Sequence, residues 1–214
     1  ADVKVGGNDL DVGQGPIKVT SIRDPKDLPW KELDVDIAME CTGIFASREK
    51  ASMHLDAGAK RVLVSAPASG VDLTVVYGVN HQKISKDHLV ISNASCTTNC
   101  LAPVVKVVHE NLGIKHGQIT TIHNPTNTNV VMDAIHNDLR RARSSMSSLQ
   151  PTTTGSATAI ALIYPELKGK LDGHAVRVPV ANASLTDCVF ELEKETNIAE
   201  VNQLFKSAAK HYLA

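Results

Sequence analysis

Apolar strand-like segments alternate with an amphipathic helical segment through the first half of the chain, and this alternation constrains the fold more than any other feature of the sequence. Residues 35–43, 61–67, 74–80 and 88–93 have the apolar character of buried strands, and residues 47–59 resemble a helix that ends at Gly58. Strands and helices in this order form a parallel sheet, which binds ligands at the carboxyl ends of its strands. The sequence therefore predicts an α/β fold here.

The pattern changes on both sides of this segment. Residues 1–30 contain short strands broken by Gly and Pro, as in hairpins. After residue 93 the sequence predicts a helix around Cys96, strands at 117–124, 174–180 and 183–193, and helices at 156–167 and 197–210. The polar stretch between 125 and 155 is longer than a simple connector, which is typical of functional loops. We expect two domains, 1–93 and 94–214, the second of them α+β with a mixed or antiparallel sheet.

Charge and cysteine content exclude several classes of function. The formal net charge is −1, so nothing indicates a nucleic-acid or membrane-surface partner. No apolar run reaches the roughly 20 residues of a membrane span. The four cysteines form no CxxC pair, which is typical of reduced thiols in a cytoplasmic protein and predicts neither disulfides nor a metal site.

Cys96 stands where the apolar run LVIS gives way to a helix, among the small polar residues NAS and TTN. The first turn of a helix has unpaired N–H groups and a positive dipole end, which stabilise a thiolate or an oxyanion. Cys96 is therefore a candidate nucleophile. The alternative is a small buried residue, the usual state of a lone cysteine. Cys100, one turn further along, we interpret as a packing residue.

A thiolate that carries out acyl chemistry needs a proton carrier, and His123 is the best candidate among nine histidines. It ends the strand segment TTIH and precedes the long polar stretch. Catalytic groups collect at such strand ends. The other eight histidines have no neighbouring pattern that distinguishes them from ordinary surface or core residues.

Several blocks together resemble the glyceraldehyde-3-phosphate dehydrogenase family: SNASCTTNCLAPVVKVV, TTIH, DLRRARSS, PTTTGSATAI and VRVPVANASLTD in this order, with ECTGIF and VSAP before them. The resemblance covers essentially the whole chain and implies a Rossmann-like NAD-binding domain followed by a catalytic domain. Finer details, such as TNTNVVMDA and TTTGSATAI, resemble the arsenic-resistance subgroup that accompanies an organoarsenical exporter and forms 1-arseno-3-phosphoglycerate.

The resemblance implies oxidation of glyceraldehyde 3-phosphate through a thiohemiacetal and a thioester on Cys96, with His123 as base and acid. Inorganic phosphate or arsenate then cleaves the thioester. The site implied for this attacking anion consists of Ser95, Thr97, Thr154 and Gly155, although TTTGS is equally typical of a helix N-cap. The site implied for the substrate's own phosphate consists of Thr126 and Arg177, since a guanidinium can bond two phosphate oxygens.

The remaining implications concern cofactor and assembly. The residues implied to contact the adenine and ribose side of NAD are Thr42, Gly43, Phe45 and Ser65, and NADP is the alternative cofactor. In the family the segment around Arg140, Arg141 and Arg143 lies at a subunit interface, so these arginines contact either phosphate or a neighbouring subunit. The complete protein is expected to be a cytoplasmic homotetramer.

The chain also departs from the family pattern. Thr128 stands where an aspartate is usual, and Thr158 replaces a common lysine. No G-x-G-x-x-G lies near the start, although this motif usually binds the dinucleotide. The chain ends at SAAKHYLA, before the family's last strands and closing helix. We therefore expect an internal fragment of a longer enzyme, which does not hold NAD fully by itself.

Three alternatives remain at this point. Erythrose-4-phosphate dehydrogenase has the same frame and uses water as acyl acceptor. A non-catalytic fragment or binding module predicts no unusual reactivity at Cys96. A Cys–His hydrolase predicts hydrolysis without a dinucleotide.

Overall fold

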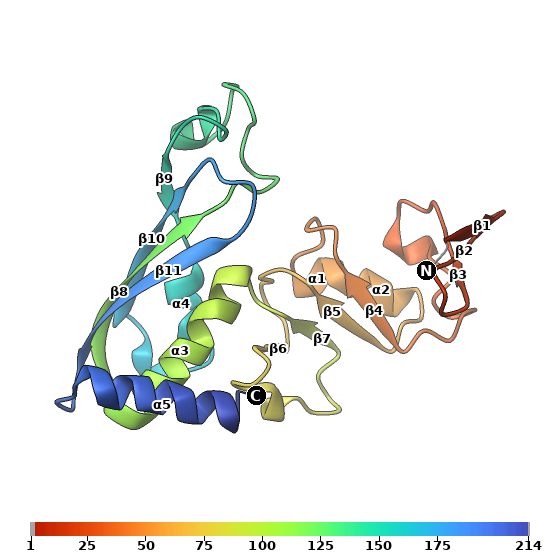
Figure 1. The fold of residues 1–214 in the computed structure, drawn as a ribbon. Helices are drawn as coiled ribbons and strands as arrows, with labels where there is room; N and C mark the ends of the chain where they lie inside the picture. The colour runs from red at the N-terminus through yellow and green to blue at the C-terminus, as the bar shows by residue number, and fades with distance from the viewer. Residues whose placement is uncertain (1–2, 214) are drawn as a thin grey trace.

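The computed structural model describes residues 3–213 (Figure 1), so residues 1, 2 and 214, at the outer ends of the two predicted domains, lie outside the described residues. A small antiparallel sheet comes first, formed by β1 (Lys4–Gly6), β2 (Asp9–Asp11) and β3 (Pro16–Lys18). Its strands are joined by turns at glycines, as the sequence predicts. This sheet lies at the opposite end of the molecule from the C-terminal sheet (Figure 1).

The next sheet is parallel, with the order β4-β5-β7-β6. Its strands are β4 (Ile37–Glu40), β5 (Arg61–Val64), β6 (Leu73–Thr74) and β7 (Val90–Ser92). Alternate residues of β4, β5 and β7 are buried, and Val62, Val64 and Val90 form a core with Ala51 from the helix that covers them. The predicted α/β fold is confirmed for this part of the chain.

The second large sheet is mixed, with the order β11-β8-β10-β9. Its strands are β8 (Ile114–His123), β9 (Gln150–Thr153), β10 (Leu171–Arg177) and β11 (Ser184–Leu192). The helices α3 (Cys96–Leu112), α4 (Ser156–Ile160) and α5 (Ile198–Lys210) pack beside it (Figure 1). Leu101 and Val105 of α3 bury their side chains with Ile119 of β8 and Ile160 of α4, so this core fixes the start of α3 relative to the end of β8.

Several predicted elements are shorter than expected, each for a local reason. The helix at 47–59 is divided into α1 (Arg48–Ala51) and α2 (Met53–Asp56), and it ends before Gly58, whose φ is +106°. The helix at 156–167 becomes α4, a turn and the 3-10 helix η4 (Pro165–Leu167), because Pro165 cannot continue the hydrogen-bond ladder. The strand at 74–80 stops after Thr74, since the Asn80 side chain binds Thr74 O and Val76 N and closes a turn.

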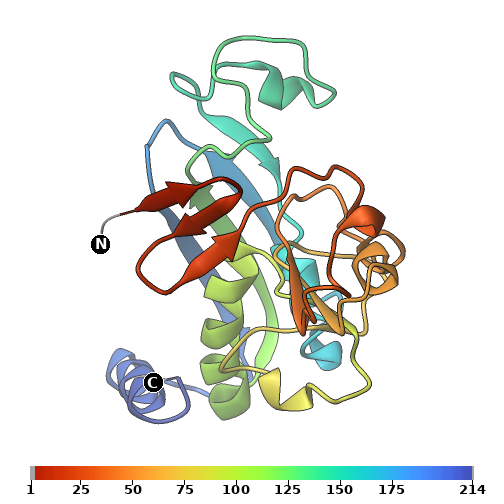
Figure 2. The same cartoon turned by 90° about the vertical axis from the view of Figure 1, so that its right-hand side faces the viewer.

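The polar stretch after β8 forms a long excursion that projects beyond the end of the sheet (Figures 1 and 2). It contains the 3-10 helix η3 (Leu139–Ala142) and returns as β9, a strand that the sequence did not predict. Two further 3-10 helices, η1 (Pro25–Asp27) and η2 (His81–Lys83), belong to the first half of the chain.

Candidate active site

Cys96 begins α3, and its position follows from the cap of that helix. Ser95 is the N-cap, and its Oγ accepts a hydrogen bond from Thr98 N at 3.1 Å. The amides of Cys96 and Thr97 precede the helical ladder, so they remain available to a ligand. Cys96 is exposed and unpaired, which answers the alternative that it is a buried core residue.

His123 ends β8, and its Nε2 lies 3.4 Å from Cys96 Sγ. The sequence predicted this pair, and the packing of α3 against β8 brings the two residues together. The imidazole is 6% exposed, so it is held in one place. A thiol–imidazole contact of this length allows direct proton transfer between the two groups.

Arg177 ends β10 and lies beside His123 because the two strands pair in parallel register, with Arg177 opposite His123. Its Nη1 donates to Asn124 O at 2.9 Å and lies 2.7 Å from His123 Nδ1. Burial and the neighbouring charge of Arg141 lower the pKa of Arg177, while the charge of Cys96 opposes this shift. Arg177 Nε is buried without a hydrogen-bond partner among the described residues, which suits a guanidinium that awaits an anion.

A cavity of about 230 Å³ opens between these groups. Five of the six residues predicted to bind anions line it, namely Ser95, Thr97, Thr154, Gly155 and Arg177, together with Cys96 and His123. Hydroxyls surround it, and Ser95 Oγ lies 3.3 Å from Ser156 Oγ, which Thr154 Oγ1 also reaches at 3.1 Å. Gly155 is the N-cap of α4 and makes no side-chain cap hydrogen bond. The two readings of TTTGS, a helix N-cap and an anion site, therefore refer to the same stretch of backbone.

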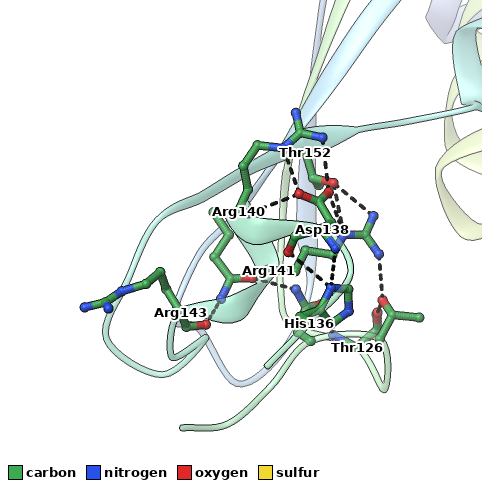
Figure 3. A network of polar contacts seen from close by, with 10 residues as sticks. Thr126, His136, Asp138, Arg140, Arg141, Arg143 and Thr152 are labelled. Atoms are coloured by element: carbon green, nitrogen blue, oxygen red, sulfur yellow. Dashed lines mark hydrogen bonds and ion pairs between the residues drawn. The ribbon is translucent and has the colours of Figure 1, made fainter. Parts of the chain in front are cut away.

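Thr126 is the sixth predicted anion-binding residue, and it is exposed on the excursion after β8 rather than in this cavity. Its neighbour Thr128 accepts from Arg141 Nη1 at 3.4 Å. Arg141 Nη2 also donates to Thr152 Oγ1 of β9 at 2.9 Å, a contact that Figure 3 marks. The Arg141 side chain therefore joins the start of the excursion to its returning strand β9.

The other two arginines of the segment pair with carboxylates, and Arg140 shares Asp138 with Arg141, whose Nε lies 3.7 Å from Asp138 Oδ2. Arg140 forms a bidentate ion pair with Asp138 at 3.0 and 3.1 Å, and Arg143 pairs with Asp133 at 3.0 Å. These pairs occupy both guanidinium groups within the excursion (Figure 3 shows the first). Sequence alone could not separate Arg141 from its neighbours, because all three share one short basic run.

Our interpretation of Cys100 as a packing residue is wrong. Cys100 is exposed and lines a second cavity of about 280 Å³ with Cys96, His123 and Asn182. It lies on the same face of α3 as Cys96, since residues four apart on a helix are neighbours. Cys188 is the half-buried thiol instead, and burial raises its pKa to about 11.

The predicted cofactor residues gather at the carboxyl edge of the parallel sheet. Thr42, Gly43 and Phe45 follow β4, and Ser65 follows the adjacent β5. Ser65 N donates to Glu40 O at 2.9 Å, which ties the two strand ends together. Thr42, Gly43 and Ser65 are exposed at this edge, where a dinucleotide would bind.

Beneath this edge lies a buried polar network that sequence reasoning missed. Glu40 Oε1 accepts from Thr42 N at 2.7 Å, and Glu40 Oε2 lies 3.0 Å from His54 Nε2. Trp30 Nε1 donates to His54 Nδ1 at 3.0 Å. Burial raises the pKa of Glu40, but the hydrogen bonds from Thr42 and His54 outweigh it and hold the pKa below its ordinary value. No sequence pattern marked these residues, because they come from separate elements.

Residues 3–213 contain neither a metal cluster nor a membrane-spanning helix. No group of three or more His, Cys, Asp or Glu side chains is arranged to hold a metal ion there. None of the helices in this range has both the length and the apolar character needed to cross a bilayer.

A parallel sheet with an exposed carboxyl edge, followed by a mixed sheet that places a cysteine against a histidine beside a cavity, is the arrangement expected of the class of dehydrogenases that use a cysteine nucleophile. Two family models match the chain. Glyceraldehyde 3-phosphate dehydrogenase, C-terminal domain, matches residues 95–214, and glyceraldehyde 3-phosphate dehydrogenase, NAD binding domain, matches residues 1–48. The chain belongs to the glyceraldehyde-3-phosphate dehydrogenase family.

Curated relatives agree with this assignment. The chain is 58% identical to a glyceraldehyde-3-phosphate dehydrogenase of Xanthobacter flavus, over 99% of this chain and 63% of that protein. Identity is 56% to the enzyme of Cereibacter sphaeroides, over 98% and 62% of the two chains, and 55% to that of Geobacillus stearothermophilus, over 98% and 63%. The chain thus spans less than two thirds of the length of the relatives that it matches.

Proposed function

We propose that the protein oxidises glyceraldehyde 3-phosphate with NAD and transfers the acyl group to an inorganic oxyanion. The observation that carries this proposal is the 3.4 Å contact of Cys96 Sγ with His123 Nε2 at the mouth of a cavity that Arg177 and several hydroxyls line. A nucleophile, a base and two kinds of anion ligand are thus within one site.

The chemistry follows from these positions. His123 takes up the thiol proton of Cys96 as the sulfur adds to the aldehyde carbon. It then returns this proton to the alkoxide, near the first amides of α3, to give a thiohemiacetal. NAD, when bound, supplies a hydride acceptor. His123 removes the hydroxyl proton as the hydride leaves, so that a thioester remains on Cys96. Attack by the oxyanion on the thioester carbon then releases the acyl group, and the Cys96 thiolate is restored.

The anion sites divide between the two ends of the substrate. We assign the substrate phosphate to Arg177 and Thr126 and add Arg141, whose guanidinium is held between Thr128 and Thr152. The attacking anion would occupy the hydroxyl-lined part of the cavity, which is formed by Ser95, Thr97, Thr154 and Gly155. Hydroxyls and helix-start amides bind phosphate and arsenate alike, so the geometry supports either as acceptor.

The cofactor and the assembly are proposed on different grounds. Thr42, Gly43, Phe45 and Ser65 would hold the adenine and ribose of NAD at the edge of the parallel sheet, with residues 1–93 and 94–214 as the two domains. A cytoplasmic homotetramer would cover the apolar face of the second sheet. Leu185 and Val189 of β11 are 59% and 65% exposed on that face, which suits a subunit contact.

A chimera tests the proposal directly. These 214 residues would replace the matching segment of the Xanthobacter flavus enzyme, and NADH formation from glyceraldehyde 3-phosphate would be measured with phosphate, with arsenate and with neither. We expect turnover that requires one of the two anions and disappears in the Cys96→Ser variant. Equal turnover without either anion, or a preference for erythrose 4-phosphate, would support the water-dependent alternative.

The same chimera tests the other assignments. Substitution of NADP for NAD measures the cofactor preference, and sedimentation of the chimera measures the assembly. A chimera that folds and assembles but forms no NADH would favour the non-catalytic alternative.

A further inference from the structure

The turn that carries the chain from β7 into α3 has a backbone conformation that alanine rarely adopts. Ala94 has a φ of +58° and is 3% exposed. Any residue with a Cβ is disfavoured in this left-handed region, so it persists only where the surrounding structure holds it. Ala94 lies two residues before Cys96, so this turn leads directly into the residue that carries the sulfur.

Ser92 holds the turn from inside the protein. Its Oγ accepts from Ala94 N at 3.1 Å and donates to Ala66 O at 2.8 Å, and the residue is fully buried. The backbone of Ser92 is itself fixed, since Ser92 O accepts from Val75 N at 2.8 Å. A hydroxyl clamped in this way leaves the Ala94 amide little freedom.

Asn99 holds the same turn from the outer side. Its Nδ2 donates to Asn93 O at 2.7 Å and to Ser95 O at 2.9 Å. The carbonyl groups on both sides of Ala94 are therefore tied to the first turn of α3. The left-handed residue is thus enclosed by two side chains that bind only backbone atoms.

The Ser92 hydroxyl also reaches the loop that follows β5. Its acceptor Ala66 lies between Ser65, which we assign to the cofactor, and Pro67, which lines the cavity that contains Cys96. One buried hydroxyl thus connects the edge of the parallel sheet with the turn before the nucleophile. Among the described residues, Ser92 alone has a side chain that hydrogen-bonds both Ala66 O and Ala94 N.

We propose that Ser92 is a positioning residue, which holds Ala94 in its left-handed conformation and thereby keeps the Cys96 sulfur facing His123. The inference rests on the proposed function, in which Cys96 is the nucleophile. It assigns to Ser92 no contact with substrate or cofactor. Glycine at position 94 adopts the same conformation without steric cost, so it removes the need for the Ser92 hydroxyl.

The test measures the alkylation rate of Cys96 by iodoacetamide in the 214-residue chain, by mass spectrometry, with exposed Cys41 in the same molecule as reference. We expect Ser92→Ala to slow alkylation of Cys96 relative to Cys41 by about fivefold or more, because small displacements of reacting groups have large effects on rate. Adding Ala94→Gly to this variant should restore the rate to within about twofold of the original.

Two controls separate positioning from general loosening. Ser52→Ala removes another hydroxyl that donates to a backbone carbonyl, Arg48 O at 2.7 Å, and should leave the Cys96 to Cys41 ratio unchanged. Ala94→Gly alone should also leave the ratio within about twofold, because Ser92 still holds the turn. Circular dichroism establishes that each variant is folded.

Asn99→Ala provides a second route if Ser92→Ala does not fold, since Asn99 is only partly buried. It should slow alkylation of Cys96, and Ala94→Gly should again restore it. The proposal would be overturned if the Ser92 and Asn99 variants left the Cys96 to Cys41 rate ratio unchanged. It would also be overturned if they lowered this ratio and Ala94→Gly did not restore it. Alkylation needs neither substrate nor NAD, so this result is independent of turnover in the chimera.

Discussion

The Nε2 atom of His123 lies 3.4 Å from the Sγ atom of Cys96, although 27 positions separate the two residues in the chain. The sulfur starts a helix and the imidazole ends a strand, and both elements are held by one apolar core. The parallel register of β8 and β10 places Arg177 opposite His123 and so beside the imidazole. The residues that we propose as nucleophile, base and phosphate ligand are therefore fixed by the packing of α3 and by the pairing of β8 with β10.

The first prediction concerns the base. His123→Gln keeps a polar side chain near Cys96 but removes the proton carrier, so NADH formation by the chimera should fall by about 10²–10⁴-fold. Stopped-flow absorbance measures this rate. His174→Gln, on β10 of the same sheet, is the matched control. Turnover that survives in His123→Gln would remove His123 from the mechanism.

The second prediction concerns the substrate phosphate. Arg177→Lys keeps the charge but loses the planar pair of donors, so kcat/KM for glyceraldehyde 3-phosphate should fall by about tenfold or more. The loss should be much smaller for unphosphorylated glyceraldehyde, which has no partner for the guanidinium. Arg143→Lys is the control, because Arg143 pairs with Asp133 away from the cavity. Equal losses for both aldehydes would contradict the assignment.

The third prediction ranks the thiols. Cys96 should react first with iodoacetamide because its sulfur is exposed, contacts His123 and lies at a helix start. Cys188 should react last near neutral pH, since burial raises its pKa to about 11 and little of it is ionised. Peptide mass spectrometry over time gives the order. Uniform slow labelling of all four cysteines would favour the non-catalytic alternative.

The fourth prediction concerns acid stability. Asp72 accepts from Leu89 N and Val90 N at 2.9 Å and pairs with Arg48. The Arg48 guanidinium and these amides hold the pKa of Asp72 at about 2, below its ordinary value of 3.8, despite partial burial. A depressed pKa means that the ionised group stabilises the fold above pH 3.8, and that this stabilisation is lost as the pH falls toward 2.

Asp72→Asn should therefore lower the free energy of unfolding at neutral pH by about 1–3 kcal/mol. The difference from the original protein should shrink as the pH approaches 2. Thermal unfolding followed by circular dichroism at several pH values gives this profile. The exposed Asp87→Asn serves as control, and a pH-independent difference for Asp72→Asn would refute the argument.

The fifth prediction uses the sole tryptophan as a reporter of the network beneath the cofactor edge. Glu40→Gln removes the charge that accepts from Thr42 and His54, and should lower Tm by about 3–8 °C. Trp30 donates to His54, so its fluorescence should change in the same variant. Glu49→Gln, on an exposed helix position, should change neither quantity.

The sequence by itself determined most of the elements, β9 excepted, and the chemical character of the site. The alternation of apolar segments predicted the parallel sheet, and the small polar residues around Cys96 predicted a helix start. These are local properties, because the period of burial and the capping of a helix depend on residues within one or two turns. The family resemblance named five anion-binding candidates that line the cavity with Cys96 and His123, whereas the sixth, Thr126, lies on the excursion.

The tertiary structure alone decided the relationships across the chain. It placed Cys100 on the accessible face of α3, separated Arg141 from Arg140 and Arg143, and brought Glu40, His54 and Trp30 together under the cofactor edge. It also showed that the amide of Ala94 donates to Ser92 Oγ. Such contacts depend on strand register and on how a helix packs on a sheet. The pattern of apolar residues within one segment specifies neither the register nor the packing.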